Sequence, residues 1–405
     1  MDRGGMRPYP IRTSWDTIPP WRHQVRELRD SFAAPAWSGG TMNATNEYSK
    51  GGAPVKSSSP AHLAIGVSFL LLGACPSASA QTVNYHLLKT VPLPAAPGAR
   101  EYFDYLSVDA DARRVYVTHG TEVDVLNADD FSLIGKIGGL QLSHAVVVLK
   151  ELGKGFITDG EGKKVVSFDP KTLKITGEVV TGQEDTDALV YDPASKYLFS
   201  INGNSGNATV IDPVKMSAVK MIDLGGSAEF PVVDGKGTLY DNNEAKNDIV
   251  VIDTHALAIK SRWPTAPAGT VTALAADFKN NRLFSAGRKP QFLVMMDATN
   301  GKVLQSFPIS AGVDAAVFEP DTNLLFASTR EGVVHIYHED SPDKLSEVQA
   351  LKTEYGAKTM AVDPKTHNIF VSTSDFDPPA APTEKQPNPN PRAKQGNFRV
   401  LVYAP

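Results

Sequence analysis

Residues 208–212 read ATVID, and this short apolar strand ending in an aspartate decides the fold because the chain repeats it. The same pattern appears as VDVLN, VVSFD, IVVID, LVMMD and VVHIYH, which end at Asn127, Asp169, Asp253, Asp297 and His338. With Asp212 included, successive ends are 42, 43, 41, 44 and 41 residues apart. A period of about 40–45 residues is typical of a β-propeller, in which each repeat forms one blade.

A second series of apolar strands keeps the same period. Its strands end at Asp109, Asp192, Asp234, Asp277, Glu319 and Asp363, and each is followed by a turn and another β-rich run. Each repeat therefore contains four strands, A to D, joined by turns rich in Asp, Asn, Gly and Pro. These six A strands, and the matching strand of the second repeat that contains His144, make seven. The sequence thus predicts an all-β chain, a seven-bladed β-propeller of four-stranded antiparallel blades.

The seventh blade lacks its outer strand, because the chain ends soon after a strand pattern at residues 398–403. Residues 85–93, in contrast, form a strand pattern that belongs to no blade of its own. We expect this N-terminal strand to complete blade 7. Such closure pairs the last open edge and locks the ring.

The first 80 residues are expected to lie outside the propeller. Residues 61–80 contain an apolar run that follows two lysines and ends in the small residues ASA, the pattern of a secretory signal peptide. We expect the mature chain to begin at Gln81, residues 81–405 to form the propeller, and residues 1–60 to be an unstructured extension from an over-extended start site. N-terminal sequencing tests these expectations. A lipid anchor at Cys75 is the alternative to simple cleavage.

Charge and cysteine content narrow the functions of residues 81–405. This segment holds 32 of the 40 Lys and Arg residues and 40 of the 45 Asp and Glu residues, which leaves a net charge of −8. A general nucleic-acid binder needs a basic surface, so this balance argues against one. The single cysteine lies in the signal region, which excludes disulfides from the mature chain. We expect the mature chain to be a monomer without a membrane span. Because of the signal-peptide pattern, we expect it in the periplasm or outside the cell.

Residues 115–120, VYVTHG, together with the repeated strand ends, resemble the YVTN-repeat (YncE-like) propeller family over residues 84–405. The resemblance implies a seven-bladed, WD40-like fold and a periplasmic or surface location. It implies little chemistry, because related propellers include lactonases, proteins associated with single-stranded DNA, and binding scaffolds. A true WD40 repeat is disfavoured, since Trp263 is the one tryptophan of residues 81–405.

Polar residues recur where each predicted A strand begins. Because A strands line the central channel of a propeller, their first residues form a ring at one channel mouth. The predicted ring residues, 40, 43, 42, 43, 42 and 44 positions apart, are Asp104, His144, Asp187, Glu229, Thr272, Asp314 and Lys358. This concentration of polar groups predicts a ligand-binding site at the mouth.

The ring also suggests a metal site. Crowded carboxylates must take up protons, pair with a cation such as Lys358, or bind a metal ion. The candidate metal ligands are Asp187, Glu229, His144 and Asp314. Oxygen ligands suit Ca²⁺, whereas an imidazole among them admits a transition metal. The alternative is structural, since acidic residues at turns often cap backbone amides.

The hairpins between the B and C strands open on the same face as the ring. They place there a predicted rim made of His119, Asp159, Asn202, Asn242, Asn243, Arg288, Arg330 and Asp375. Arg288 and Arg330 come from adjacent blades and are expected to bind an anionic group. The hairpin of blade 7 carries a Pro-rich insertion, residues 375–397, interpreted either as a lid or partner-binding arm or as a surface loop without a role.

Three functions follow from these features. The leading one is an exported binding or scaffold propeller that takes a small ligand, a metal or a partner protein at the mouth, because the chain has no nucleophile motif. The second is a metal-assisted, lactonase-like hydrolase with His144 or a ring carboxylate as base. The third, association with single-stranded DNA, needs a basic, aromatic groove and is disfavoured by charge. The hydrolase requires a bound divalent ion and the scaffold does not, so this requirement distinguishes the two functions.

Overall fold

The structure is a computed structural model that describes residues 83–96, 100–383 and 389–405. The expectations for residues 1–60, the signal peptide at 61–80 and Cys75 therefore lie outside the described residues. The described residues all belong to one compact unit, Pro76–Pro405. None of the helices found among them is long and apolar enough to cross a membrane.

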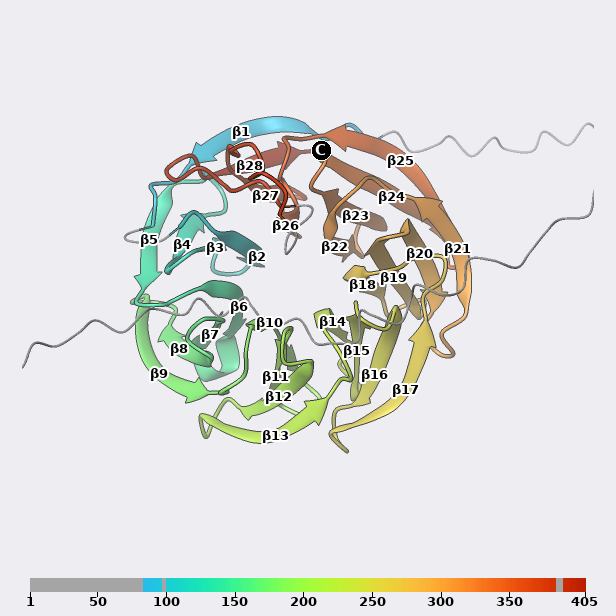
Figure 1. Ribbon diagram of the computed structural model, residues 1–405, viewed down its shortest axis with the longest axis horizontal. Helices are drawn as coiled ribbons and strands as arrows, with labels where there is room; N and C mark the ends of the chain where they lie inside the picture. Colours follow the sequence, from blue (N-terminus) through green and yellow to red (C-terminus); the bar gives the residue numbers. More distant parts are fainter. Residues whose placement is uncertain (1–82, 97–99, 384–388) are drawn as a thin grey trace, which may run out of the picture. The chain divides into compact units, whose positions relative to one another are not determined.

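Seven four-stranded antiparallel sheets surround a central axis, which confirms the predicted seven-bladed β-propeller (Figure 1). In blades 1 to 6 the first strand lies nearest the axis and the fourth lies outermost. Blades 1 to 3 consist of β2 (Phe103–Asp109), β3 (Arg114–His119), β4 (Glu122–Asn127), β5 (Leu133–Gly138), β6 (Ser143–Leu149), β7 (Lys154–Asp159), β8 (Lys164–Asp169), β9 (Lys174–Val180), β10 (Thr186–Asp192), β11 (Tyr197–Asn202), β12 (Asn207–Asp212) and β13 (Ser217–Asp223).

The remaining blades repeat this plan. Blades 4 to 6 consist of β14 (Ala228–Val233), β15 (Thr238–Asn243), β16 (Asp248–Asp253), β17 (Ala258–Pro264), β18 (Val271–Asp277), β19 (Arg282–Arg288), β20 (Gln291–Asp297), β21 (Val303–Pro308), β22 (Val313–Glu319), β23 (Leu324–Thr329), β24 (Val333–Ser341) and β25 (Lys344–Lys352). Blade 7 consists of β26 (Thr359–Val362), β27 (Ile369–Thr373), β28 (Arg399–Ala404) and β1 (His86–Pro92).

The N-terminal strand closes the ring, as the sequence predicted. Strand β1 pairs antiparallel with β28, from His86 opposite Ala404 to Pro92 opposite Arg399. Figure 1 shows β1, in blue, on the outside of blade 7 beside the red β28. The first and last strands of the propeller are thus held together by a backbone ladder, which leaves β28 without an open edge.

The repeated aspartates owe their spacing to one kind of turn. Asp212 Oδ1 accepts backbone N–H groups of Val214 and Lys215 at 3.0 and 2.9 Å, and it thereby caps the turn between strands C and D. Backbone N–H groups stabilise the ionised carboxylate in the same way at Asp169 and Asp253, and they lower the pKa of all three aspartates. The aspartates therefore recur at the blade period because the same capped turn between strands C and D recurs from blade to blade.

The apolar core is divided among the interfaces between blades. Seven clusters of buried side chains are present in the described residues, and each joins mainly two neighbouring blades. At the closure, for example, Val115 and Val117 of blade 1 pack in one cluster with Phe370 and Val400 of blade 7. Because each blade is buried on both faces, its middle strands are almost continuously apolar. This packing holds the inner strands, and the residues at their ends, in fixed positions.

Candidate functional site

The ring residues lie at irregularities in the pairing of strands A and B. In blade 1 the register shifts between Phe103 and Leu106, around Asp104. Similar shifts bracket or adjoin the ring positions in blades 2 to 6, at His144, Asp187, Glu229, Thr272 and Asp314. A β-bulge bends a strand and redirects its side chains. The bulges thus allow ring side chains from different blades to contact one another.

Asp104, His144 and Asp187, from blades 1, 2 and 3, meet in one cluster. His144 Nδ1 lies 2.7 Å from Asp104 Oδ2 and 3.2 Å from Asp187 Oδ1. The Tyr102 hydroxyl lies 3.1 Å from Asp104 Oδ2 and 3.2 Å from His144 Nδ1. On the opposite side of the imidazole, Asp185 Oδ1 lies 3.9 Å from His144 Nε2. The side chains of Asp104 and His144 are 9% and 2% exposed, so the cluster is largely shielded from water.

This cluster leaves buried polar atoms without hydrogen-bond partners. Among the described residues these atoms include His144 Nε2, Asp187 Oδ1 and the Tyr105 hydroxyl. A proton on His144 Nδ1 that is donated to Asp104 cannot also satisfy Asp187. A buried polar atom without a partner costs about 1–3 kcal/mol. The cluster can therefore gain free energy by binding a further group.

The carboxyl groups on this side of the mouth are not easily ionised together. Burial opposes a charge on His144, but the charge of Asp187 and the hydrogen bond to Asp104 outweigh it and raise the pKa of His144 well above 6.5. Burial raises the pKa of Asp187 to about 6 in spite of His144, and it also raises the pKa values of Asp185 and Glu229. Blades 1 to 4 thus form an acid-rich half of the mouth, which a bound cation would stabilise.

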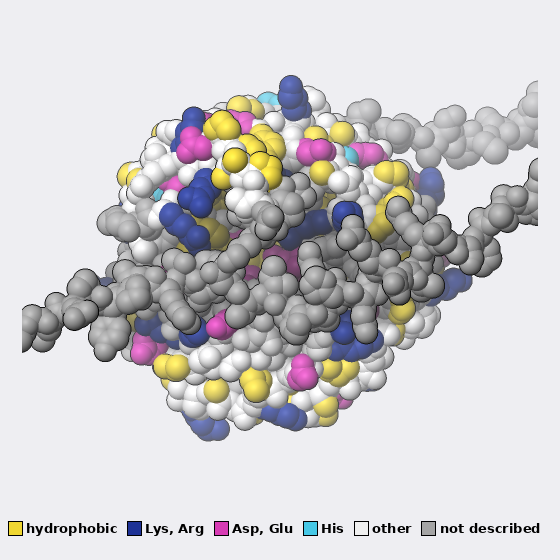
Figure 2. All heavy atoms as spheres, in the orientation of Figure 1, with side chains coloured by type: hydrophobic (Ala, Val, Ile, Leu, Met, Phe, Trp, Pro, Cys, Tyr) yellow, Lys and Arg dark blue, Asp and Glu magenta, His cyan; other side chains and the backbone are white. Residues whose placement is uncertain are grey.

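The other half of the mouth is an ion-pair network built by blades 4 to 7. Lys358 Nζ lies 2.5 Å from Asp314 Oδ2, and Arg288 Nη2 pairs with Asp314 Oδ1. Arg288 Nη1 also lies 3.0 Å from Glu244 Oε1, to which the Thr272 hydroxyl donates a hydrogen bond at 2.7 Å. The charge of Asp314 is therefore balanced by two cations. Figure 2 shows acidic side chains, with basic ones nearby, at the centre of the face turned to the viewer.

Two charged residues of the predicted site have no close partner. The side chains of Glu229 and Arg330 make no hydrogen bond or ion pair with the described residues, although Arg288 attracts Glu229 and Asp314 attracts Arg330 at longer range. One residue beyond Asp104 and Glu229 along their strands, the rings of Tyr105 and Phe230 meet with centroids 5.2 Å apart. These aromatic rings come from blades 1 and 4, so they span the channel next to the polar groups. The polar groups of this mouth, together with the two aromatic rings beside them, are called the polar cup below.

The structure places Asn202 and Asn242 in the protein interior instead of at the exposed rim that the hairpins suggested; both are 0% exposed. Asn202 Nδ2 donates to Asn207 and Thr209 within blade 3. Asn242 Nδ2 donates to the Ala273 carbonyl at 2.8 Å and so joins blades 4 and 5. The two side chains are buried because strand B, which carries them, is covered by the neighbouring blades.

Tyr102, Asp185 and Glu244 contact the ring but were not among the predicted site residues. Tyr102 and Asp185 each stand two positions before a ring residue, Asp104 and Asp187. A polar or aromatic residue at this position of the repeat was the available signal. Glu244 lies in a hairpin turn after β15, where an acidic residue is too common to signal a site.

The Pro-rich insertion is anchored at its base. Its described ends pair through a bridge between Phe376 and Ala393, and Asp377 N donates to the Arg392 carbonyl at 2.8 Å. Gly396 N donates to Glu101 Oε2 at 2.7 Å, which connects the insertion to blade 1. The role of lid or partner-binding arm stays a prediction.

His119, another residue of the predicted rim, is buried in a separate ion cluster. Its Nε2 lies 2.6 Å from Glu101 Oε1 and its Nδ1 lies 2.8 Å from Asp124 Oδ2. Lys136 pairs with Glu122 and lies 3.1 Å from Asp124 Oδ1. Burial opposes protonation of His119, but the hydrogen bonds to Asp124 and Glu101 outweigh it and raise its pKa to about 9. Because Glu101 also binds Gly396, the cluster stabilises the contact between blades 1 and 7.

This pKa predicts a pH-dependent stability. A group with a raised folded-state pKa stabilises fully below its unfolded value, about 6.5 here, and this stabilisation is lost as pH rises through about 9. The loss is on the order of 3 kcal/mol in the free energy of unfolding. We expect urea denaturation between pH 6 and pH 10 to show it, and His119→Gln to reduce the slope. Parallel pH profiles for the two proteins would exclude this role.

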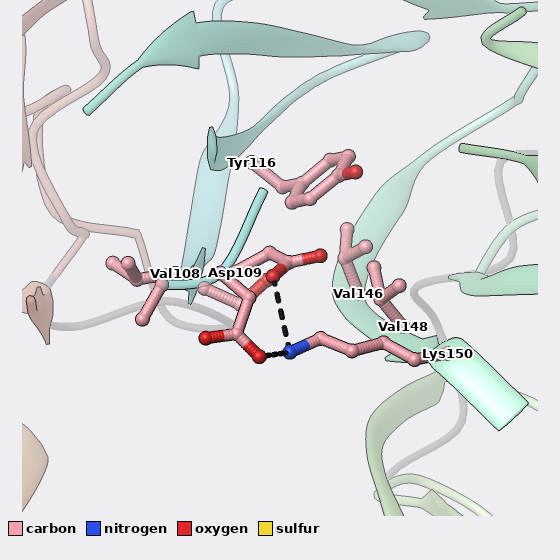
Figure 3. A pocket seen from close by; sticks show the side chains of 9 residues that line it. Val108, Asp109, Tyr116, Val146, Val148 and Lys150 are labelled. Carbon is pink, nitrogen blue, oxygen red and sulfur yellow. Dashed lines mark hydrogen bonds and ion pairs between the residues drawn. The ribbon is translucent and has the colours of Figure 1, made fainter. Parts of the chain in front are cut away.

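A cavity of about 360 Å³ lies at the opposite end of the A strands, between blades 1 and 2 (Figure 3). Val108, Val146 and Val148 line it, and Lys150 crosses it to Asp109, 3.6 Å away. Lys150 also pairs with Asp111. No sequence pattern predicted this cavity, because its walls are ordinary strand and turn residues of two blades.

Comparison with solved structures supports the fold. A chain of the "Crystal Structure of Mitotic Checkpoint Complex" matches with a TM-score of 0.62 and 14% identity over 80% of this chain and 94% of that chain. A chain of "Kuenenia stuttgartiensis Hydrazine Synthase" matches with a TM-score of 0.58 and 13% identity over 69% and 94%. No protein-family model and no curated protein matches the chain. The chain is therefore a seven-bladed β-propeller, and the YVTN-repeat resemblance stays an expectation.

Proposed function

We propose that this propeller is a binding protein that takes a small, charged ligand in the polar cup at the channel mouth. The observation that carries the proposal is the set of unsatisfied groups there. Asp187 Oδ1 and the Tyr105 hydroxyl are buried without a hydrogen-bond partner, and Glu229 and Arg330 have only longer-range charge partners, Arg288 and Asp314, among the described residues. Charged residues in a structural network satisfy one another, as Asp314 and Lys358 do. Polar groups left unsatisfied together at one mouth of the channel are suited to a ligand.

The ligand is inferred to carry both positive and negative charge. The acid-rich half offers Asp185, Asp187 and Glu229 to a cationic group, whereas Arg330, whose guanidinium makes no hydrogen bond with the described residues, is suited to an anionic group. The rings of Tyr105 and Phe230, which lie next to these groups, suit a short apolar segment between the two charged groups of the ligand. Free amino acids and short peptides have this chemistry.

Thermal unfolding tests the proposal. We expect lysine, glutamate, arginine or a dipeptide, added at millimolar concentration, to raise the melting temperature, because a ligand of the folded state at 100 times its Kd adds about 2.7 kcal/mol. The double variant Glu229→Gln/Arg330→Ala should lose this shift. Lys150→Ala, in the cavity at the other end of the A strands, is the control and should keep it. No shift with any probe, or an unchanged shift in the double variant, would refute the proposal.

A metal-assisted hydrolase is the alternative, and the Asp104–His144–Asp187 cluster is the observation that favours it. It requires a metal ion that activates water, so it depends on the metal test described below. Export is part of the proposal as well, supported by the signal-peptide pattern at residues 61–80. A cell-associated precursor that is never cleaved would contradict export.

A further inference from the structure

Two groups of His and carboxylate side chains hold their ligand atoms within 4.8 Å of one another in the described residues: Asp104, His144 and Asp187, and His119, Glu122 and Asp124. The second group is already neutralised. Lys136 pairs with both of its carboxylates, and both ring nitrogens of His119 have a carboxylate partner. A metal ion there would have to displace a lysine. The group at the mouth, Asp104, His144 and Asp187, is therefore the better candidate for a metal site.

The mouth group is less fully neutralised than the second group, because its ion pair with a lysine is long and involves only one of its two carboxylates. Lys358, the nearest cation from another blade, lies 4.0 Å from Asp104 Oδ1, whereas Oδ2 of the same carboxylate faces His144 Nδ1 at 2.7 Å. Asp187 Oδ1 lies 3.2 Å from that nitrogen and has no hydrogen-bond partner. Neighbouring ligands of a metal with bonds of about 2.1 Å are roughly 3 Å apart. The three atoms thus have the spacing of ligands around one ion.

The far side of the imidazole is the second observation, because a ring nitrogen there is buried without a partner. A metal-bound histidine usually donates its other ring N–H to a carboxylate. His144 Nε2 is buried without a hydrogen bond, and Asp185 Oδ1 lies 3.9 Å from it. Gly160 makes room for this edge of the ring, since a Cβ at residue 160 would lie 2.5 Å from Nε2. The surroundings of His144 therefore suit a ring bound through Nδ1.

We propose that Asp104 Oδ2, His144 Nδ1 and Asp187 Oδ1 bind one divalent first-row transition metal ion, with the Tyr102 hydroxyl as a supporting hydrogen-bond partner and the Asp185 carboxylate next to the unpaired Nε2 of His144. One imidazole and two carboxylates suit Mn²⁺, Co²⁺ and Zn²⁺, and Zn²⁺ should bind most tightly of the three. Three protein ligands leave coordination positions free for water or for a donor atom of the ligand. The inference rests on the proposed function, because the ion is part of the same cup.

Calorimetric titration of chelator-treated protein with Co²⁺ and Zn²⁺ tests the proposal. We expect one ion per chain, and a visible Co²⁺ spectrum that reports nitrogen and oxygen ligands. Asp104→Asn and Asp187→Asn preserve side-chain volume and should weaken binding at least about 100-fold. Gly160→Ala, which displaces the imidazole without removing a ligand, should weaken it by about 10–100-fold, as outer-shell changes do.

The matched control is Asp340→Asn. Asp340 lies 2.8 Å from His338 Nδ1 on the outer part of blade 6, so it reports adventitious binding by a surface His–Asp pair. It should leave affinity and stoichiometry unchanged, and circular dichroism should show every variant folded. No binding by the wild-type protein at millimolar metal, or equal binding by folded Asp187→Asn, would overturn the proposal.

The small-ligand proposal and the metal proposal can be refuted independently of each other. If the cup binds a small molecule but no metal, the melting-temperature shift with an amino acid persists in the presence of a chelator, and only the metal proposal is lost. If the cup binds metal but no amino acid or dipeptide, one ion per chain is found without any shift by those probes, and only the zwitterionic ligand is lost.

Discussion

Replacing Tyr85 and Leu93 together with alanine is expected to reduce the free energy of unfolding by about 5–10 kcal/mol. An aromatic-to-alanine change in a core costs about 3–5 kcal/mol and a leucine-to-alanine change about 2–5 kcal/mol. The two residues flank β1, are 2% and 4% exposed, and belong to different clusters, so their effects should add. The expected loss equals most of the stability of a typical domain.

Leu87 and Leu88 provide a control within the same strand. Each is 51% exposed on the outside of the ring, so replacing both with serine should change stability by less than about 1 kcal/mol. Equilibrium denaturation measures both effects, and size-exclusion chromatography detects association through the loosened edge of β28. If the free energy of unfolding of Tyr85→Ala/Leu93→Ala lay within about 1 kcal/mol of the wild-type value, closure by β1 would not stabilise the ring.

Asp314→Asn is expected to have the second-largest effect, at the mouth itself. Asp314 is 3% exposed and pairs with Lys358 and Arg288, so its neutralisation leaves two cations facing each other in a shielded site. Breaking a buried pair costs about 3–5 kcal/mol. Because the Arg288 side chain is 34% exposed and water can solvate it, we expect the lower end of that range.

This variant should also change the acid limb of the stability profile. Burial opposes ionisation of Asp314, but Lys358 and Arg288 outweigh it and lower its pKa below 3.8. A lowered pKa gives a stabilisation that is present above 3.8 and lost as pH falls below it. Asp343→Asn is the control, since Asp343 pairs with Arg282 at 2.7 Å but is 77% exposed. Equal effects of the two substitutions on thermal unfolding would contradict a buried network at the mouth.

The blade pattern could be predicted from the sequence because strands end in residues that cap the next turn, as Asp212 does. In blade 3, for example, the strands predicted to end at Asp192 and Asp212 are observed as Thr186–Asp192 and Asn207–Asp212. Such turns depend on neighbours two to four residues away. Closure by residues 85–93 followed from counting strands.

The grouping of the ring side chains was not readable in the same way. Spacing predicted seven positions around one mouth but not that Asp104 and Asp187 would share His144, or that Arg288 would pair with Asp314. These contacts depend on the bulges of strand A and on side-chain directions across blades separated by about 40 residues. The burial of Asn202 and Asn242 depends in the same way on packing between blades.

Anomalous diffraction from crystals soaked in Mn²⁺ tests the central claim most directly, because it locates the ion without assuming its ligands. The account predicts one strong peak per chain, within bonding distance of Asp104 Oδ2, His144 Nδ1 and Asp187 Oδ1, and no comparable peak at His119. A peak at the His119 cluster, peaks on surface carboxylates alone, or no peak at the mouth would contradict it.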